Sequence, residues 1–256
     1  MIPVYVINLA RSSDRRAWME RQLAEAGVAA RFVVAVDGRR CRRETQAANA
    51  PRRLSKAETA LILSHRKAWR ALLASPAAVA VVLEDDVRLG RGFAETLALD
   101  WPGRGYELVK LETMFDKVWL SRAGQAMGAR RLHRLGAEHH GAAAYLINRV
   151  GAKKMLGATR SLREPVDITL FGRAAIFGGS VEAWQLAPAI AAQQHLLAGP
   201  GEPDFASALQ ADRAATPRDA LSLPQRLGRE ARRVVAQAVR VARLAPTMRR
   251  RRVEFE

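Results

Sequence analysis

Short apolar segments alternate with amphipathic segments through residues 1–197, and this order constrains the fold more than any other feature of the chain. "PVYVINL" predicts a buried strand, and the following "SSDRRAWMERQLAEAGV" predicts a helix that ends at Gly27. "RFVVAVDG" then precedes a helix-like "LSKAETALILSHRKAWRALLAS", in which Ser55 and Glu58 form a capping-box pattern. "YELVKLE" and "GAAAYLI" predict further strands, while Phe93–Leu97 and "RVGAKKMLGA" predict helices. Strands alternating with helices favour an α/β domain with a mostly parallel central sheet.

The segment "AVAVVLEDDVRLG" places three carboxylates directly after a strand-like run. Residues 78–83 are all apolar, and Glu84, Asp85 and Asp86 follow without a spacer. Like charges about 4 Å apart repel by roughly 4 kcal/mol near a protein surface. Ligands of open α/β sheets bind beyond the carboxyl ends of the strands, and Mg²⁺ or Mn²⁺ takes oxygen ligands and recruits substrate phosphates. The triplet therefore predicts a divalent-cation site for a phosphorylated substrate, although acids at strand ends are also often solvated and without function.

Four other polar residues each have a functional and an ordinary interpretation. Arg15, in the first turn of the first helix, could hold phosphate or be solvated. Asp37 could bind a ligand or only form a turn, and His65 sits mid-helix, where a packed or surface histidine is more typical than a catalytic one. Asp167 could be a helix cap after Pro165.

Composition and charge narrow the class of protein. The 256 residues are 49% hydrophobic, enough for a folded core, and no stretch approaches the roughly 20 apolar residues of a membrane-spanning helix. The N-terminus is apolar before it is basic, the reverse of a secretory signal, and the single Cys41 cannot form an internal disulfide. We therefore expect a cytoplasmic protein. The net charge of +17 suits a phosphate-bearing partner.

The texture of the chain changes after residue 197. Residues 198–224 are rich in Pro and Gly and predict a linker, and residues 225–256 predict a basic amphipathic helical tail. The tail holds ten arginines against three acids, so it could lie on an anionic membrane or simply be solvated. The arginine-rich "RRCRRETQAANAPRR" could likewise contact acceptor phosphates or be a solvated insertion.

Taken together and in order, these segments resemble glycosyltransferase family 25. The resemblance rests on "VYVINLARSSDRRAWMERQLAEAGV", "FVVAVDGR", "LSKAETALILSHRKAWRALL", "VVLEDDVRL" and "GAAAYLINRVGAKKML" with "PVD", from about Ile2 to about Gln193. It implies a GT-A-like nucleotide-sugar-binding fold over residues 1–197. It also implies inverting transfer of a sugar, commonly galactose, from a UDP-sugar with Mn²⁺ or Mg²⁺. The acceptor would be a hydroxyl of lipooligosaccharide, lipopolysaccharide or another cell-surface glycan, reached from the cytoplasm or from the inner face of the cytoplasmic membrane.

The resemblance also assigns roles to individual residues. Glu84, Asp85 and Asp86 stand where the metal-binding acids belong, with Asp86 as the first choice for a direct ligand. The residues expected to bind the nucleotide or line the donor pocket are Asn8, Arg11, Arg15, Asp37, Ser64 and His65. Asp167, in "PVD", is the first choice for the base that deprotonates the acceptor, and Glu112, at the end of "YELVKLE", is the second.

Two other functions remain open at this point. The basic charge would suit a nucleic-acid-binding protein, but Phe, Trp and Tyr make up only 6% of the chain and no recognition motif is present, so we expect no nucleic acid partner. A relative that has lost catalysis and serves as a scaffold is the other alternative. The intact acidic triplet argues against it.

Overall fold

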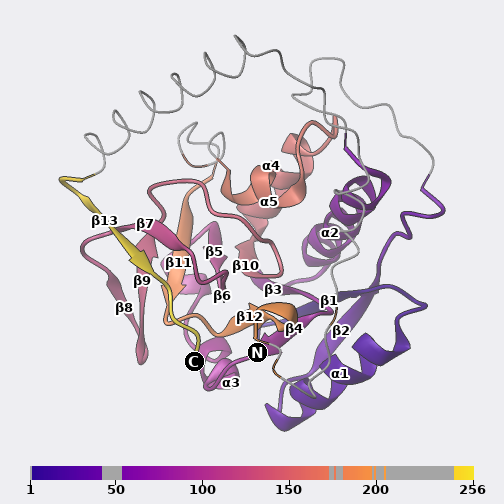
Figure 1. Cartoon of the computed structure of the whole chain (residues 1–256), viewed down its shortest axis with the longest axis horizontal. Coiled ribbons are helices and arrows are strands. Elements are labelled where there is room, and N and C mark those ends of the chain that lie inside the picture. Colours follow the sequence, from indigo (N-terminus) through magenta and orange to yellow (C-terminus); the bar gives the residue numbers. More distant parts are fainter. Residues whose placement is uncertain are drawn as a thin grey trace.

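An eight-stranded mixed sheet forms the centre of the structure, with helices on both faces (Figure 1). This computed structural model describes residues 2–41, 54–172, 176, 181–197, 199, 205 and 245–256. In spatial order the strands are β2 (Ala30–Val34), β1 (Val4–Asn8), β3 (Val79–Glu84), β10 (Ala144–Asn148), β5 (Leu108–Lys110), β11 (Ala183–Ala187), β9 (Arg130–Arg134) and β8 (Gln125–Met127).

The α/β class is confirmed, but the expectation of a mostly parallel sheet is wrong. β1 pairs in parallel with β2 and β3, and β5 with β11. β10 runs antiparallel to both β3 and β5, and the β11–β9 and β9–β8 pairs are also antiparallel. Strands buried on both faces are apolar in either direction, so their composition does not reveal the direction of β10.

Two small sheets flank the central one. β4 (Val87–Leu89), β12 (Ala191–Gln193) and β6 (Glu112–Thr113) form the first, in the order β4-β12-β6. β13 (Met248–Arg252) and β7 (Lys117–Ser121) form the second, an antiparallel pair. The predicted strand "YELVKLE" is therefore two short strands, β5 and β6, that belong to different sheets.

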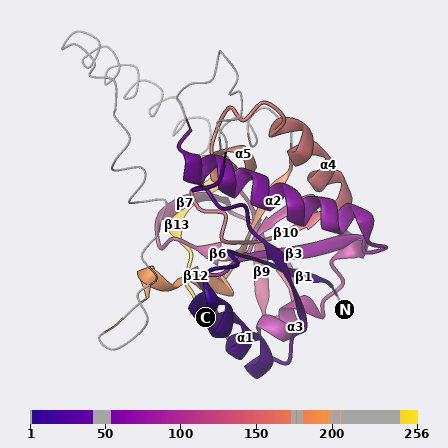
Figure 2. The same cartoon turned by 90° about the vertical axis from the view of Figure 1, so that its right-hand side faces the viewer.

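Helices cover the two faces of the central sheet separately (Figure 2). α2 (Lys56–Ala74), α4 (Arg149–Ala158) and α5 (Val166–Phe171) lie on one face, and α1 (Ser13–Glu25) and α3 (Phe93–Leu97) on the other. Short 3-10 turns occur at Pro102–Arg104 and Gln194–Leu196. Among the helices that the structure describes, none combines the length and the apolar character that crossing a bilayer requires.

Each central strand feeds two hydrophobic cores, because successive side chains on a strand point to opposite faces. On β1, Tyr5 and Ile7 join the core under α2, whereas Val4 and Val6 join the core under α1. Almost every residue of β1, β3 and β10 is buried, which explains why these three strands are largely apolar on both faces rather than alternating.

The predicted helix ends agree with the structure where their local chemistry is strong. Ser55 and Glu58 make both hydrogen bonds of the capping box that begins α2. Gly27, just after α1, has a φ of +65°, a conformation that glycine adopts without strain. Asp167 is not a helix cap: Pro165 holds that position, and Asp167 lies in the first turn of α5.

The described end of the chain corrects part of the expected helical tail. Residues 225–244 lie outside the described residues, as do nearly all of the expected linker 198–224 and residues 42–53 of the arginine-rich segment. Residues 248–252, however, form β13 and not a helix. After β13, the amide of Ala189 donates to the carbonyl of Glu254 (2.8 Å), and the amide of Glu256 donates to the carbonyl of Ala189 (3.1 Å). The segment 248–256 is therefore part of the main fold.

Candidate active site

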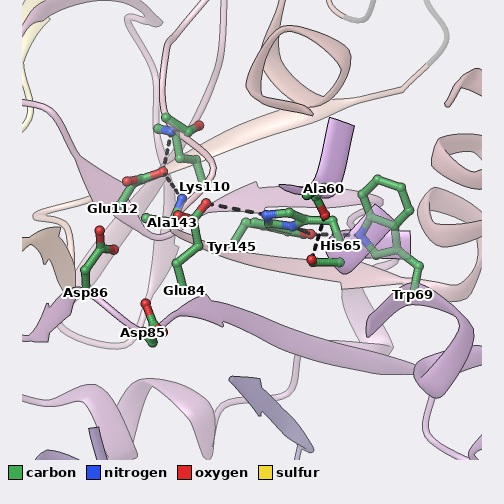
Figure 3. Close-up of polar contacts among 12 residues, drawn as sticks. Ala60, His65, Trp69, Glu84, Asp85, Asp86, Lys110, Glu112, Ala143 and Tyr145 are labelled. Atoms are coloured by element: carbon green, nitrogen blue, oxygen red, sulfur yellow. Dashed lines mark hydrogen bonds and ion pairs between the residues drawn. The ribbon is translucent and has the colours of Figure 1, made fainter. Parts of the chain in front are cut away.

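The acidic triplet lies where several strands end at one edge of the central sheet. β1 and β3 are parallel, with Ile7 opposite Glu84, so Asn8 and the triplet leave the sheet together. β5 runs in the same direction as β3, because both are antiparallel to β10. Glu112, just after β5, therefore joins the same group of carboxylates (Figure 3).

The carboxylates of Glu84 and Asp86 are crowded; Asp86 is buried, and Glu84 keeps 14% of its side chain exposed. Asp86 is 4% exposed, and its Oδ1 has no hydrogen-bond partner within the described residues. Burial raises the pKa of Glu84 to about 8, and the nearby charges of Glu112 and Asp85 add to this. Burial likewise raises the pKa of Asp86 to about 8, with Glu84 as the next cause. The site thus lacks part of the positive charge that would hold both groups ionised at neutral pH.

Asn8 and Arg15 supply part of the compensation. The Nδ2 of Asn8 donates to Oδ2 of Asp85 (2.8 Å), and Nη1 of Arg15 lies 3.0 Å from Oδ1 of Asp85 and 3.6 Å from Oδ2 of Asp86. Burial alone would lower the pKa of Arg15, but the carboxylates of Asp86 and Asp85 raise it, so the guanidinium stays charged. The structure thus brings Asn8, Arg15 and the triplet together.

These acids fit a divalent cation whose remaining coordination positions are filled by its substrate. Within the described residues no group of three or more His, Cys, Asp or Glu side chains forms a ready metal cage. Mg²⁺ and similar ions, however, are usually held by one or two carboxylates and take their other ligands from water and substrate phosphates. The unpartnered Oδ1 of Asp86 and the carboxylate of Glu84 match that donor set.

Glu112 is tied to a lysine that the sequence analysis did not select. Nζ of Lys110 lies 2.8 Å from Oε1 of Glu112 and donates to the carbonyl of Gly141 (2.6 Å). The same Oε1 accepts from the amide of Ala143 (2.8 Å), while Oε2 of Glu112 is buried and has no partner within the described part of the chain. Burial lowers the pKa of Lys110, and Glu112 opposes that shift. A lysine inside the apolar "LVKL", two residues before an acid and therefore on the same face of the strand expected from the sequence, is a signal that could have identified this pair.

His65 is completely buried and points toward Glu84. Its Nδ1 lies 2.8 Å from Oη of Tyr145, and its Nε2 lies 3.4 Å from Oε1 of Glu84 (Figure 3). Burial lowers the pKa of His65 to about 3, so the imidazole is neutral. Sequence reasoning selected His65 but missed Tyr145, which comes from the middle of an ordinary apolar strand.

Ser64, the neighbour of His65, makes two hydrogen bonds to the backbone. Its hydroxyl donates to the carbonyl of Ala60 (2.7 Å) and accepts from the amide of Val36 (2.8 Å). It therefore links α2 to the segment that follows β2.

Asp167 lies close enough to affect the buried groups electrostatically. Its charge adds to the raised pKa of Glu84 and, with Glu112, opposes the lowering of the pKa of Lys110 by burial. Its side chain is 14% exposed, and Oδ2 lies 3.9 Å from Nδ1 of the exposed His140. The side chain of Asp167 therefore keeps a small exposed surface, as does that of Glu84.

Arg11 and Asp37 form a separate, exposed ion pair. Oδ1 of Asp37 also accepts from the amide of Arg39 (2.9 Å). This backbone bond, followed by the contact with Arg11, lowers the pKa of Asp37. The two residues follow β1 and β2, beside the strand ends that carry the acids.

Comparison with known proteins adds a sequence likeness across most of the described fold. Residues 1–170 match the sequence model of the family described as glycosyltransferase family 25 (LPS biosynthesis protein). The lacto-N-neotetraose biosynthesis glycosyltransferase LgtB of Neisseria gonorrhoeae is 32% identical over 206 residues, which cover 74% of each chain. A probable inactive glycosyltransferase 25 family member 3 of Bos taurus is 32% identical over 64% of this chain and 30% of its own. A crystal structure of a glycosyltransferase involved in glycosylation of the major capsid of PBCV-1 aligns over 79% of this chain and 94% of its own, with 7% identity. Its TM-score of 0.38 is too low to support an argument.

Proposed function

The chain belongs to glycosyltransferase family 25, and we propose that it is a metal-dependent, inverting enzyme with a GT-A-like fold. Its donor would be a UDP-sugar, with galactose as the sugar transferred. Its acceptor would be a hydroxyl of a lipooligosaccharide, lipopolysaccharide or similar cell-surface glycan. The name of the Neisseria relatives, glycosyltransferases of lacto-N-neotetraose biosynthesis, supports the choice of a glycan acceptor.

The observation that carries the proposal is the cluster of carboxylates at the end of β3, whose negative charge is only partly neutralised by neighbouring positive groups. Asp86 and Glu84 would hold Mn²⁺ or Mg²⁺, with Oδ1 of Asp86 as the available ligand atom. A divalent cation there would neutralise the negative charge that develops on the departing diphosphate. Arg15, held beside Asp85 and Asp86, would contact the same phosphates, and Asn8 would keep Asp85 oriented. Arg11, Asp37 and the Ser64–His65 turn of α2 would border the nucleotide.

We assign the base to Asp167. Inversion requires the acceptor oxygen to attack the anomeric carbon from the face opposite the diphosphate, while its proton passes to a carboxylate. Asp167 is partly exposed, whereas Oε1 of Glu112 is already engaged by Lys110 and by the Ala143 amide. Glu112 is therefore the second choice, and its main role would be to hold Lys110 and the chain at Ala143 in place.

A thermal-shift series of nucleotide sugars, each with and without Mn²⁺, tests the proposal. We expect one UDP-sugar to raise the melting temperature when Mn²⁺ is present, and Asp86→Ala to abolish that increase. Asp116→Ala, which removes an exposed acid, is the matched control and should respond as the wild type does. Equal shifts for wild type and Asp86→Ala would overturn the metal site.

A catalytically silent relative is the second candidate, and one observation favours it. A mammalian protein matched by this chain is described as probably inactive. Mn²⁺-dependent hydrolysis or transfer of the bound UDP-sugar would exclude this function. Binding of the donor without any release of UDP, when a full series of glycan acceptors is offered, would support this function.

We also propose that the enzyme works at the inner face of the cytoplasmic membrane, where the arginines of residues 225–243 would contact anionic lipid. Truncation is a poor test, because it would also remove β13. Substituting glutamate for Arg229, Arg233 and Arg240 keeps β13. We expect this variant to lose co-sedimentation with phosphatidylglycerol vesicles, whereas lysine at the same positions should preserve it. Equal sedimentation of the glutamate and lysine variants would reject the proposal.

A further inference from the structure

Two buried hydrogen bonds and one ion-pair contact link α2, through Tyr145 on β10, to the acidic group. Nε1 of Trp69 donates to Oη of Tyr145 (2.8 Å), and Oη of Tyr145 lies 2.8 Å from Nδ1 of His65. Nε2 of His65 faces Oε1 of Glu84 at 3.4 Å and makes no hydrogen bond within the described residues. Trp69, Tyr145 and His65 are each 0% exposed, so water cannot replace any of these partners (Figure 3).

The direction of these contacts follows from what each group can donate. An indole nitrogen only donates, so Tyr145 accepts from Trp69 and keeps its own proton for another partner. Within the described residues, the other partner of the Tyr145 hydroxyl is Nδ1 of His65. A hydroxyl proton buried without an acceptor costs about 1 to 3 kcal/mol, so Tyr145 donates and Nδ1 accepts. An imidazole whose Nδ1 accepts a hydrogen bond carries its proton on Nε2, which here faces Glu84.

We infer that Tyr145 is a positioning residue: through His65 it presents an N–H group to Glu84 and thereby fixes that carboxylate as a ligand of the cation. The opposite tautomer would aim the imidazole lone pair at the carboxylate, and the repulsion would turn Glu84 away from Asp86. Outer-sphere partners of this kind commonly change metal affinity by 10- to 100-fold. The inference rests on the proposed function, since it concerns the same cation site.

The packing allows a conservative test. The rings of His65 and Tyr145 are stacked, 5.7 Å apart at 20°, and Phe171 meets Tyr145 edge-on at 6.3 Å. Tyr145→Phe keeps these ring contacts and removes only the hydroxyl. Tyr5→Phe, at a buried tyrosine on β1, is the matched control.

Two measurements on the full chain decide the matter. In the wild type, ¹⁵N NMR of the imidazole should show His65 as the Nε2–H tautomer, assigned by comparison with His65→Asn. In Tyr145→Phe the Nδ1–H form should appear. Calorimetric titration should then give Mn²⁺ binding to the UDP-loaded protein that is 10- to 100-fold weaker in Tyr145→Phe, with UDP binding without metal unchanged. Tyr5→Phe should match the wild type in both.

Each other result has a definite meaning. An Nδ1–H tautomer in the wild type overturns the inference without any variant. Unchanged Mn²⁺ affinity in Tyr145→Phe overturns it while leaving the metal site of the proposed function intact. A wild-type chain in which Mn²⁺ and UDP do not affect each other's binding would overturn both.

Discussion

Nζ of Lys110 lies 2.8 Å from Oε1 of Glu112, and neither side chain is exposed. Removing the lysine would leave a buried carboxylate without its cation, which typically costs about 3 to 5 kcal/mol. We expect Lys110→Met to lower the melting temperature by about 6 to 20 °C, since each kcal/mol is worth about 2 to 4 °C in a chain of this size. Calorimetry measures this.

The chain offers a matched surface pair as the control. Nζ of Lys154 lies 2.7 Å from Oε1 of Glu107, but both side chains are partly exposed. Exposed pairs contribute about 1 kcal/mol or less, so Lys154→Met should shift melting by only a few degrees. Similar melting shifts for the two variants would show that burial does not make the loss of Lys110 more costly than the loss of a surface lysine.

Asp167→Asn should separate catalysis from binding. If Asp167 removes the acceptor proton, the amide keeps the shape of the side chain but slows transfer by about 10² to 10⁴. Donor binding, measured by calorimetry, and the melting temperature should change little. Glu112→Gln is expected to destabilise the protein as well, because Glu112 holds Lys110. Wild-type transfer rates in Asp167→Asn would exclude Asp167 as the base.

The stability of the metal-free protein should fall as the pH rises. Burial raises the pKa of Asp86 to about 8, whereas an unfolded aspartate titrates near 3.9. The folded state therefore holds this proton more tightly, and the unfolding free energy decreases between about pH 4 and pH 8. Asp86→Asn removes this contribution.

Melting curves in the presence of a chelator, from pH 5 to pH 9, check the effect. Asp86→Asn should melt close to the wild type at pH 5 and about 2 to 6 °C above it at pH 8. Asp116→Asn, at the exposed acid, should follow the wild type throughout. Parallel curves for Asp86→Asn and the wild type would mean that Asp86 is not held in an unfavourable ionised state.

Thr113 connects the acidic group to the end of the described chain. Its hydroxyl donates to the carbonyl of Val253 (2.7 Å) and accepts from the amide of Phe115 (2.9 Å). Thr113→Val keeps the shape but leaves two polar groups without partners, at a cost of about 1 to 3 kcal/mol. We expect melting to fall by about 2 to 12 °C and restoration by Thr113→Ser. Proteolysis should also cleave the 248–256 segment faster in the valine variant, and an unchanged cleavage rate would contradict this attachment.

Local chemistry predicted the helices and the place of the triplet well. The capping residues Ser55 and Glu58 act within one turn of helix, and apolar residues that precede consecutive acids mark the end of β3 without any tertiary information. Predictions from short-range signals of this kind agree with the structure because they do not depend on distant partners.

Strand direction and the buried contacts between distant residues could not be predicted from local sequence patterns. The reversed direction of β10 is decided by strands far away in sequence, and β13 pairs with β7 across more than a hundred residues. His65 could be selected from its motif, yet its partner Tyr145 comes 80 residues later. Register, rather than residue type, brings Tyr145 opposite Lys110 and Val82.

The pairing of β13 with β7 has a consequence for biosynthesis. A ribosome-bound chain that has not yet exposed residues 248–256 leaves β7 as an open strand edge, which other chains can pair with. Contacts as distant as Thr113 to Val253, 140 residues apart, also carry a large loop-closure entropy and tend to form late. We therefore expect translation intermediates to be protease-sensitive around β7 until β13 has paired with it. Chaperone protection would matter most during this period.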